Sequence, residues 1–248
     1  MLEPNLEIGQ FHTGIYTREE GHVLPVKVAE ACMNQIDAAG GKLHIGTEVE
    51  SISQDGDKVL LHSPDGHREF DKVVIAAGTD STGLALTAGI NLPQRRSPGV
   101  VVKTNPLPSF IKNLSTIYLP ALSKEEKELH IRQSTDGVVM IGAGDQESEA
   151  EDASQEYADK LVQRASLHFN QLSGVDAIRV PVGFRPMPED GLPVIGSSPA
   201  NNNIYLTLMH SGVTLAPLVG ALAALEITTG ISNADLDPYR PSRFSIKA

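Results

Sequence analysis

The sequence is poor in several residue types that would point to particular functions. Among its 248 residues it has no tryptophan and one cysteine, Cys32. A single cysteine excludes an internal disulfide and is compatible with a reducing compartment. The 20 lysines and arginines are outnumbered by 31 aspartates and glutamates, which gives a net charge of -11. Because a phosphate backbone is bound by clustered basic side chains, we expect no nucleic-acid partner.

Long hydrophobic runs and targeting signals are also scarce. Residues 1–7 have neither a basic start nor an apolar core, so we expect no secretory signal and a cytoplasmic location. The longest apolar stretch, residues 213–225, contains Pro217 and Gly220. It is shorter than the ~20 residues that a membrane-spanning helix needs. We therefore expect no transmembrane segment.

The first third of the sequence combines one helical pattern with short β-rich runs. Apolar residues at helical spacing after Pro25 predict an amphipathic helix that stops at Gly40. Cys32 falls on its apolar stripe, where we expect a buried, inert thiol. Four β-rich runs follow, at residues 42–46, 48–53, 58–63 and 72–77. They predict a strand followed by a β-meander, and the last run is apolar on both faces, as in a parallel strand buried between layers.

The middle of the sequence is mostly strand-like, with runs at 100–102, 115–119, 129–133 and 138–141. Prolines and Gly-containing turns divide these runs, which predicts a second, antiparallel sheet. Residues 138–144 begin like a dinucleotide-binding fingerprint, but the carboxylates at 145 and 147 would repel a pyrophosphate, so we reject that interpretation. We interpret the acidic stretch 145–156 as a solvated loop that leads into a helix ending near Leu172. Leu161, Ala165 and Phe169 are expected to share one face of that helix.

In the C-terminal part we expect strands near 177–184 and 204–208. This part also contains three blocks with chemical meaning: Gly183–Pro186, Asp190–Gly196 and His210–Pro217. In the last block a strand runs through a glycine turn into a helix expected at 215–229. If Thr214 caps this helix, Pro217 lies in its first turn, and the preceding amides point outward without partners. Such a helix start suits an anion or the polar edge of a ring. The same local pattern also describes a well-capped helix that binds nothing.

In this order and spacing, the three blocks resemble the C-terminal part of FAD-dependent oxidoreductases of the D-amino-acid oxidase, glycine oxidase and sarcosine oxidase superfamily. The likeness continues upstream through Gly21–Pro25, Glu48–Glu50 and Val74–Gly78. The N-terminal G-x-G-x-x-G loop, which holds the FAD pyrophosphate in this fold, is not found near residue 10. The chain thus looks like a truncated enzyme, and we expect an N-terminal FAD-binding segment or subunit as its partner.

The resemblance implies FAD as the cofactor and a set of contacts to it. The residue that matches Val49 contacts the adenine end of FAD through its backbone. The turn formed by Ala76, Ala77 and Gly78 lies beside the dinucleotide. The segment that meets the flavin ring consists of His210, Ser211, Gly212, Val213 and Thr214. Donors at that position stabilise the negative charge that builds up on a reduced flavin.

Arg185 resembles the arginine that grips the substrate carboxylate in the amino-acid-oxidising members. A guanidinium can make two charge-assisted hydrogen bonds to a carboxylate, although a structural ion pair is the alternative. For His210 two roles stay open, that of a packing or hydrogen-bonding residue and that of a catalytic base. The reaction implied by the resemblance is hydride transfer from a substrate C–H beside an amine to the flavin, followed by hydrolysis of the imine. Such chemistry needs orientation more than acid-base groups, and we assign no catalytic residue.

The expected fold is α/β plus antiparallel β. Residues 1–92 and 178–248 would form a partial, Rossmann-like FAD-binding domain, and residues 93–177 an inserted antiparallel substrate-binding sheet domain. The expected function is that of an FAD-dependent oxidase or dehydrogenase of a small amine or amino acid, incomplete without its N-terminal nucleotide-binding part. The alternative is a flavin-free binding or scaffold protein derived from that fold.

Overall fold

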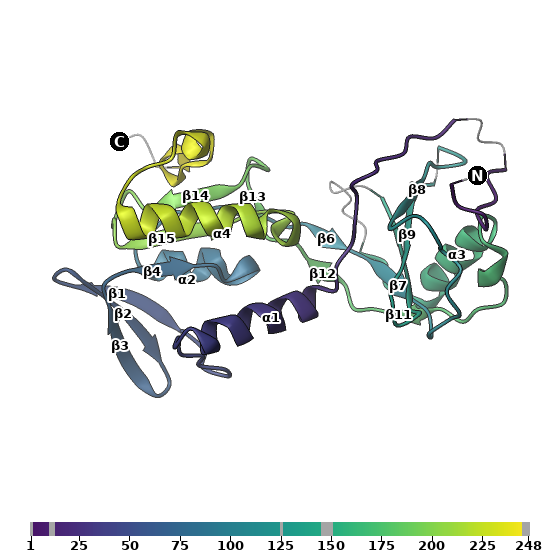
Figure 1. The fold of residues 1–248 in the computed structure, drawn as a ribbon. Coiled ribbons are helices and arrows are strands. Elements are labelled where there is room, and N and C mark those ends of the chain that lie inside the picture. The colour runs from purple at the N-terminus through teal and green to yellow at the C-terminus, as the bar shows by residue number, and fades with distance from the viewer. Residues whose placement is uncertain (1, 10–12, 125, 145–150, 245–248) are drawn as a thin grey trace. The chain divides into compact units, whose positions relative to one another are not determined.

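The computed structural model of the chain describes residues 2–9, 13–124, 126–144 and 151–244. The chain divides into two compact units, and Figure 1 shows the elements of both. The first, here called the sheet unit, comprises Met1–Gln35 and Ser97–Gly183. The second, the mixed unit, comprises Ile36–Arg96 and Phe184–Ala248. Helices occur together with several antiparallel sheets, as expected for the mixed α/β class.

The sheet unit is built on a five-stranded antiparallel sheet in the order β11-β7-β10-β9-β8. Its strands are β7 (Val101–Lys103), β8 (Ile117–Leu119), β9 (Leu129–Gln133), β10 (Val139–Ala143) and β11 (Ile178–Arg179). The predicted antiparallel sheet is therefore confirmed. β10 runs antiparallel to both of its neighbours, which agrees with rejecting residues 138–144 as a dinucleotide fingerprint. Residues 145–150, expected to be a solvated loop, lie outside the described residues.

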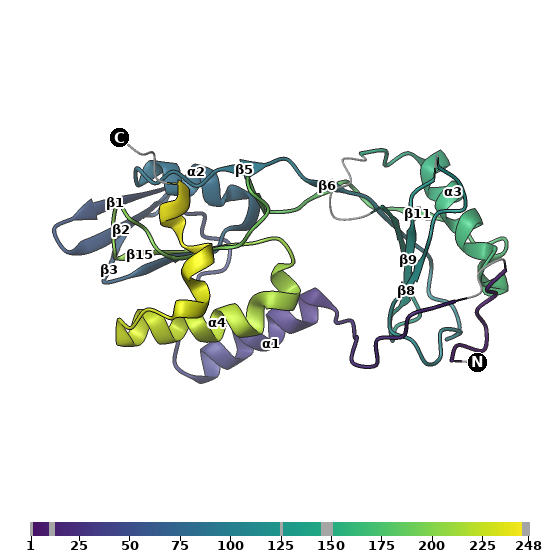
Figure 2. The same cartoon turned by 90° about the horizontal axis from the view of Figure 1, so that it is seen from above.

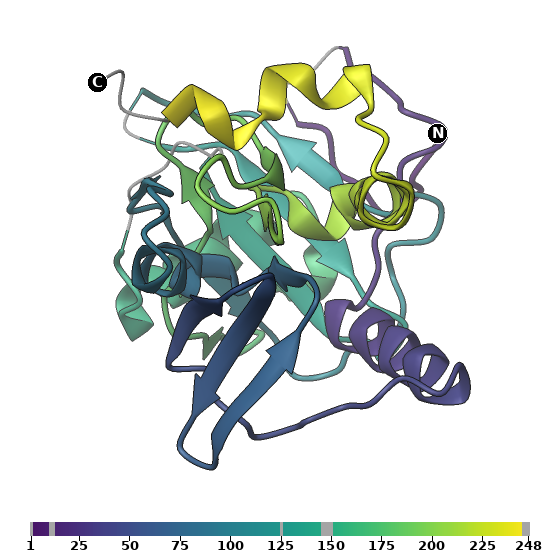
Figure 3. The same ribbon diagram turned by 90° about the vertical axis from the view of Figure 1, so that its left-hand side faces the viewer.

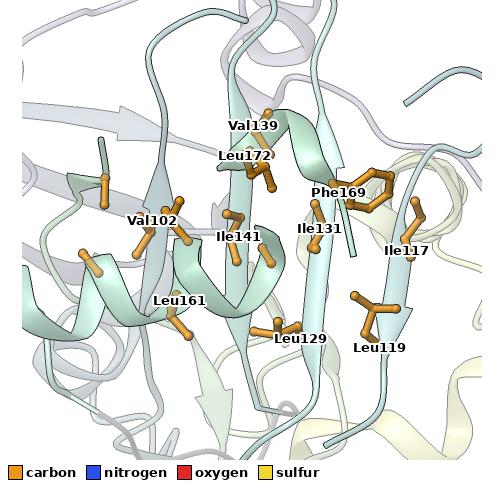
Figure 4. Packing of buried hydrophobic residues seen from close by; sticks show 14 of the residues in the cluster. Val102, Ile117, Leu119, Leu129, Ile131, Val139, Ile141, Leu161, Phe169 and Leu172 are labelled. Atoms are coloured by element: carbon orange, nitrogen blue, oxygen red, sulfur yellow. The ribbon is translucent and has the colours of Figure 1, made fainter. Parts of the chain in front are cut away.

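The core of the sheet unit lies between this sheet and α3 (Gln155–Ser166), which packs along one face (Figure 2). Ile131, Val139 and Ile141 are fully buried and alternate with less buried residues, as the period of a strand requires (Figure 4). The Ser154 hydroxyl caps α3 by accepting the Tyr157 N–H. The predicted shared face is confirmed for Leu161 and Ala165, which are both buried in this cluster. Phe169 is buried there too, but α3 ends at Ser166, before the predicted end near Leu172. Phe169 lies beyond the helix, just before the short 3-10 turn η2 (Asn170–Leu172).

The mixed unit contains a three-stranded sheet in the order β14-β15-β4. β14 (Val194–Ser197) runs antiparallel to β15 (Ile204–Leu208), and β15 runs parallel to β4 (Val73–Ile75). α4 (Gly212–Thr229) covers one face, and α2 (Ser81–Thr87) packs on the other (Figure 3). The predicted meander is present as the strands β1 (Ser51–Asp55), β2 (Lys58–Ser63) and β3 (Gly66–Phe70).

Short elements complete both units. β5 (Gln94–Arg95) pairs with β13 (Met187–Pro188), and β6 (Pro98–Gly99) pairs with β12 (Gly183–Phe184). The remaining 3-10 turns are η1 (Gly78–Asp80), η3 (Ala234–Tyr239) and η4 (Pro241–Phe244). β11 pairs with β7 and so belongs to the sheet unit, whereas the sequence pattern grouped it with the nucleotide-binding part.

Two predictions for the mixed unit are wrong. Residues 42–46 do not form a strand, and the Thr47 N–H donates to the His44 carbonyl in a turn. A strand needs a neighbour to satisfy its backbone, and the described chain offers none at this position. β4 is buried on one face only, because Val73 and Ile75 are buried while Val74 is 46% exposed. Val74 lies on the same face as its partner Tyr205, and the described residues that cover Tyr205 leave Val74 about half exposed.

α4 is longer than the apolar stretch 213–225, whose short length was the reason to expect no transmembrane segment. It ends at Thr229, as predicted, and its 18 residues are long and apolar enough to cross a membrane by length and composition alone. Three of them, Val219, Ala223 and Glu226, are buried within the mixed unit. The first two pack against the sheet, so part of this helix serves the core.

α1 (Pro25–Ala38) forms as predicted but buries none of its residues. Val28 is 42% exposed, Ile36 is 47% exposed, and Cys32 is exposed as well. The expectation of a buried thiol at Cys32 is therefore wrong. An amphipathic pattern marks a face that suits packing, and no described part of this chain covers that face.

Because its thiol is exposed, we expect Cys32 to react in the native chain with one equivalent of 5,5′-dithiobis(2-nitrobenzoate), nearly as fast as in urea. Absorbance at the wavelength of the released thiolate follows the reaction, and the Cys32→Ser variant gives the blank. A thiol that reacts only after unfolding would contradict the exposed position of α1.

Candidate functional site

The site predicted from the sequence lies at the carboxyl ends of β4 and β15. These strands are parallel neighbours, with Tyr205 opposite Val74, so the chain leaves both at the same edge of the sheet. The Thr207 hydroxyl donates to the Ile75 carbonyl at 3.3 Å and links the two strands near that edge. In open α/β sheets, ligands bind outside the carboxyl ends of the strands. The loops that follow β4 and β15 are therefore the loops of the mixed unit where this rule places a ligand.

The loop after β4 contains Ala76, Ala77 and Gly78. Both alanines are exposed, and Gly78 has a φ of +60°, a conformation that favours glycine. The side chain of Gln94 holds this turn by donating from Nε2 to the carbonyls of Gly78, at 3.5 Å, and Thr79, at 3.2 Å. The sequence analysis missed Gln94, because a glutamine in a short strand has no local pattern that marks it as a support.

The loop after β15 leads directly into α4. Ser211 is the N-cap residue, with the left-handed φ of 59°, and its side chain makes no capping hydrogen bond. Instead, its Oγ lies 2.8 Å from Nδ1 of His210. The prediction that Thr214 caps the helix is therefore wrong, and Pro217 lies inside α4 rather than in its first turn. The left-handed residue reverses the chain within one position, so the helix begins three residues earlier than predicted.

This geometry leaves a set of donors at the start of α4. The first intrahelical bond runs from the Leu215 N–H to the Ser211 carbonyl at 3.0 Å. The N–H groups of Gly212, Val213 and Thr214 precede it and have no acceptor within the helix. All three residues are exposed. The helix dipole adds a partial positive charge, so the segment can bind an anion or a polar ring edge.

Val49 and Arg185 belong to the same unit. Val49 is half-buried against the hydrophobic cluster that includes Ile52 and Val73, and within the described chain its backbone N–H and C=O are without hydrogen bonds. Arg185 is half-buried and connects β12 to β13, whose partner strand β5 carries Gln94. The mixed unit thus contains every predicted site residue, with Arg185 on this connection rather than on either of the two loops.

A buried polar network fixes α4 on the sheet. The Glu226 carboxylate accepts hydrogen bonds from the Tyr205 hydroxyl at 2.6 Å, from both Nη atoms of Arg240 at 2.9 and 2.6 Å, and from the Asn233 N–H at 2.6 Å. The bonds from the Arg240 guanidinium lower the pKa of Glu226 to about 2. Burial, together with the nearby Glu226 carboxylate, raises the pKa of Tyr205. The sequence analysis missed this network, because its members are far apart along the chain.

Comparison with known proteins gives a consistent family match. The sequence matches the family described as FAD dependent oxidoreductase over residues 1–225. One of the subunits of opine oxidase from Agrobacterium tumefaciens (strain Ach5) is 28% identical over 245 residues, which cover 98% of this chain and 62% of that protein. Glycine oxidase from Geobacillus kaustophilus (strain HTA426) is 25% identical over 246 residues, which cover 98% of this chain and 63% of that protein. The chain therefore spans less than two thirds of the length of these relatives.

Solved structures show the same fold. The crystal structure of glycine oxidase from Geobacillus kaustophilus matches with a TM-score of 0.71 and 24% identity, covering 87% of this chain and 57% of that one. L-proline dehydrogenase from P. horikoshii matches with a TM-score of 0.73 and 21% identity, covering 89% and 59%. These matches agree with the mixed α/β arrangement with antiparallel sheets described above.

Replacing Arg240 by Met tests the network that holds α4. The change leaves the Glu226 carboxylate buried without its cation, and we expect the free energy of unfolding at pH 7 to fall by about 3–5 kcal/mol. Since the folded pKa of Glu226 is lowered, its stabilising contribution is present above its ordinary pKa near 4.5 and is lost as pH falls through about 2. Urea unfolding across that range measures both effects.

Arg68→Met, at an exposed arginine on β3, is the matched control and should change the stability little. Equal stability losses in the two variants would show that the network contributes nothing specific.

Proposed function

Since the chain belongs to the family of FAD-dependent oxidoreductases, we propose that it forms the flavin- and substrate-facing part of an amine or amino-acid oxidoreductase. The observation that carries this proposal is the row of unpaired backbone donors at the start of α4, beside the Gly78 turn. The polar edge of a flavin ring requires such donors. Both relatives named above are described as oxidases, so the flavin-free scaffold alternative gains no support.

The residues of the mixed unit fit FAD. In this proposal, the N–H groups of Gly212, Val213 and Thr214 bind the polar edge of the ring, with His210 and Ser211 shaping the turn. The free backbone groups of Val49 bind the adenine end, and residues 76–78 lie along the dinucleotide. When bound, FAD supplies the two-electron acceptor for oxidation of a C–H bond beside an amine. The mixed unit then corresponds to a partial, Rossmann-like FAD-binding domain.

The proposed reaction depends on how the substrate is oriented rather than on an acid or a base. Arg185 binds the substrate carboxylate with its guanidinium fork and so sets the direction of the reacting C–H bond. We propose that the inserted sheet domain, residues 93–177, forms the substrate-binding part. Small amines and amino acids are the proposed substrate class. A single anchor for a carboxylate suits a small amino acid.

A separate N-terminal FAD-binding subunit completes the site in this proposal. Two relatives are described as subunits of opine oxidase, which supports an assembly of more than one chain. β4 has a free edge in the described chain, and the half-exposed Val74 lies on it. An open edge presents unpaired backbone groups that a further parallel strand would satisfy. The uncovered apolar stripe of α1 offers a second surface for such a partner.

A charged substitution at the start of α4 tests whether this segment binds the flavin ring. Gly212→Glu places a carboxylate beside the donors, and we expect it to weaken FAD binding about tenfold. Quenching of FAD fluorescence on titration with the chain measures the affinity. An acidic residue in the first turn stabilises a helix, so weaker binding would not reflect a damaged α4.

The matched variant Gly212→Ala should bind like the parent, since its side chain would meet only Met209 Cγ at 4.0 Å. The assignment fails if the glutamate variant binds FAD as well as the alanine variant does.

Arg185→Gln tests the carboxylate anchor in the assembled enzyme. We expect kcat/KM for an amino-acid substrate to fall about 10- to 100-fold, mainly through KM, because a charge-assisted hydrogen bond is lost. The decarboxylated amine of the same substrate is the internal control and should keep its kcat/KM. An equal loss for both substrates would mean that Arg185 supports the fold rather than the carboxylate.

A further inference from the structure

The sheet unit contains a pocket whose lining includes none of the residues proposed to contact the flavin or to anchor the substrate carboxylate. Its volume is about 530 Å³, within the range of pockets that hold small molecules. Its walls come from residues 2–8, 13–20 and 113–120, and the last range includes β8. All of these residues belong to the sheet unit, whereas Arg185 and the proposed flavin contacts belong to the mixed unit.

The walls of this pocket are mostly apolar. Ile117 and Leu119 of β8 are buried core residues, and Leu6 and Leu114 pack against the same cluster. At the rim, Ile8 is 48% exposed, and the tyrosines at 16 and 118 are at least half exposed, so a good deal of apolar surface remains open to water. Covering such surface with a ligand is favourable, which selects for a ligand with an apolar body.

Charged groups of both signs line the same pocket. Arg18 and Glu20 are exposed there, and neither side chain takes part in an ion pair in the described part of the chain. Each is therefore available to a ligand group of the opposite charge. A guanidinium favours a carboxylate, and a carboxylate favours an ammonium group.

Glu3 adds a buried carboxylate to the pocket. The residue is 1% exposed, and its Oε2 accepts the N–H groups of Lys112 and Asn113, both at 2.9 Å. Its Oε1 is buried and lacks a hydrogen-bond partner among the described residues. An unsatisfied buried oxygen is costly, and a ligand donor that reaches it would remove that cost.

We propose that this pocket binds a zwitterionic amino acid with a large apolar side chain. Arg18 binds the carboxylate, Glu20 and the unpaired oxygen of Glu3 bind the ammonium group, and the apolar walls hold the side chain. The site lies within the sheet unit and shares no residue with the carboxylate anchor at Arg185. Binding there requires no flavin, so this proposal does not depend on the proposed oxidation reaction.

Calorimetric titration of the flavin-free chain with L-phenylalanine tests the site, with phenethylamine and 3-phenylpropionate as probes that each lack one charge. We expect saturable binding at one site. Arg18→Gln should weaken L-phenylalanine about tenfold while leaving phenethylamine unchanged, and Glu20→Gln should weaken phenethylamine but not 3-phenylpropionate. Ile8→Asp, which puts a charge on the apolar rim, should weaken all three probes.

A control variant separates this pocket from arginines elsewhere on the surface. Arg68→Gln, at an exposed arginine on β3, should bind L-phenylalanine like the parent chain, and far-UV circular dichroism checks that every variant is folded. The proposal is overturned by a lack of binding up to about 10 mM, which corresponds to less than about 3 kcal/mol. It is equally overturned if Arg68→Gln weakens binding as much as Arg18→Gln does.

Discussion

The parallel pairing of β4 with β15 is the constraint on which the proposed flavin site depends. These strands lie far apart in the sequence, yet their register sets Tyr205 opposite Val74 and brings both carboxyl ends to one edge. Only because of this pairing do the Gly78 turn and the start of α4 follow strands that end at the same edge, where the proposed flavin would meet both. Burial of Val73 and Ile75 on one side and of Tyr205 on the other holds the strands together from both faces.

The sequence predicted those parts of the structure that local patterns determine. The β-rich runs predicted the antiparallel sheet. Apolar residues at helical spacing predicted that Leu161 and Ala165 share one face of α3. Cys32 was misjudged because its helix has a packing face without a cover in the described chain. Glu226 and Arg240 could not be paired from sequence, since their meeting depends on how η3 folds back on α4. Likewise, the cap of α4 depends on a left-handed backbone at residue 211, a conformation that serine rarely adopts.

The family match and the structure contribute different parts of the functional picture. The family match identifies flavin chemistry, which no side chain of this sequence could reveal alone, because the reactive group belongs to the cofactor. The structure contributes the free donors of α4, the open edge of β4 and the charged, apolar pocket of the sheet unit. The proposed sites of the two units therefore differ: the mixed unit would use backbone amides together with Arg185, whereas the sheet unit would use side chains alone.

Pro217 gives the two ends of α4 unequal local stability. Proline has no N–H, so the carbonyl of Val213, four residues earlier, loses its helical partner, and the first turns are held by fewer hydrogen bonds. The other end is locked by the buried carboxylate of Glu226. α4 therefore has fewer hydrogen bonds near the end that would meet the ring and is anchored at the end that meets the core. Small shifts of its first turn would leave the hydrophobic layer behind it in place.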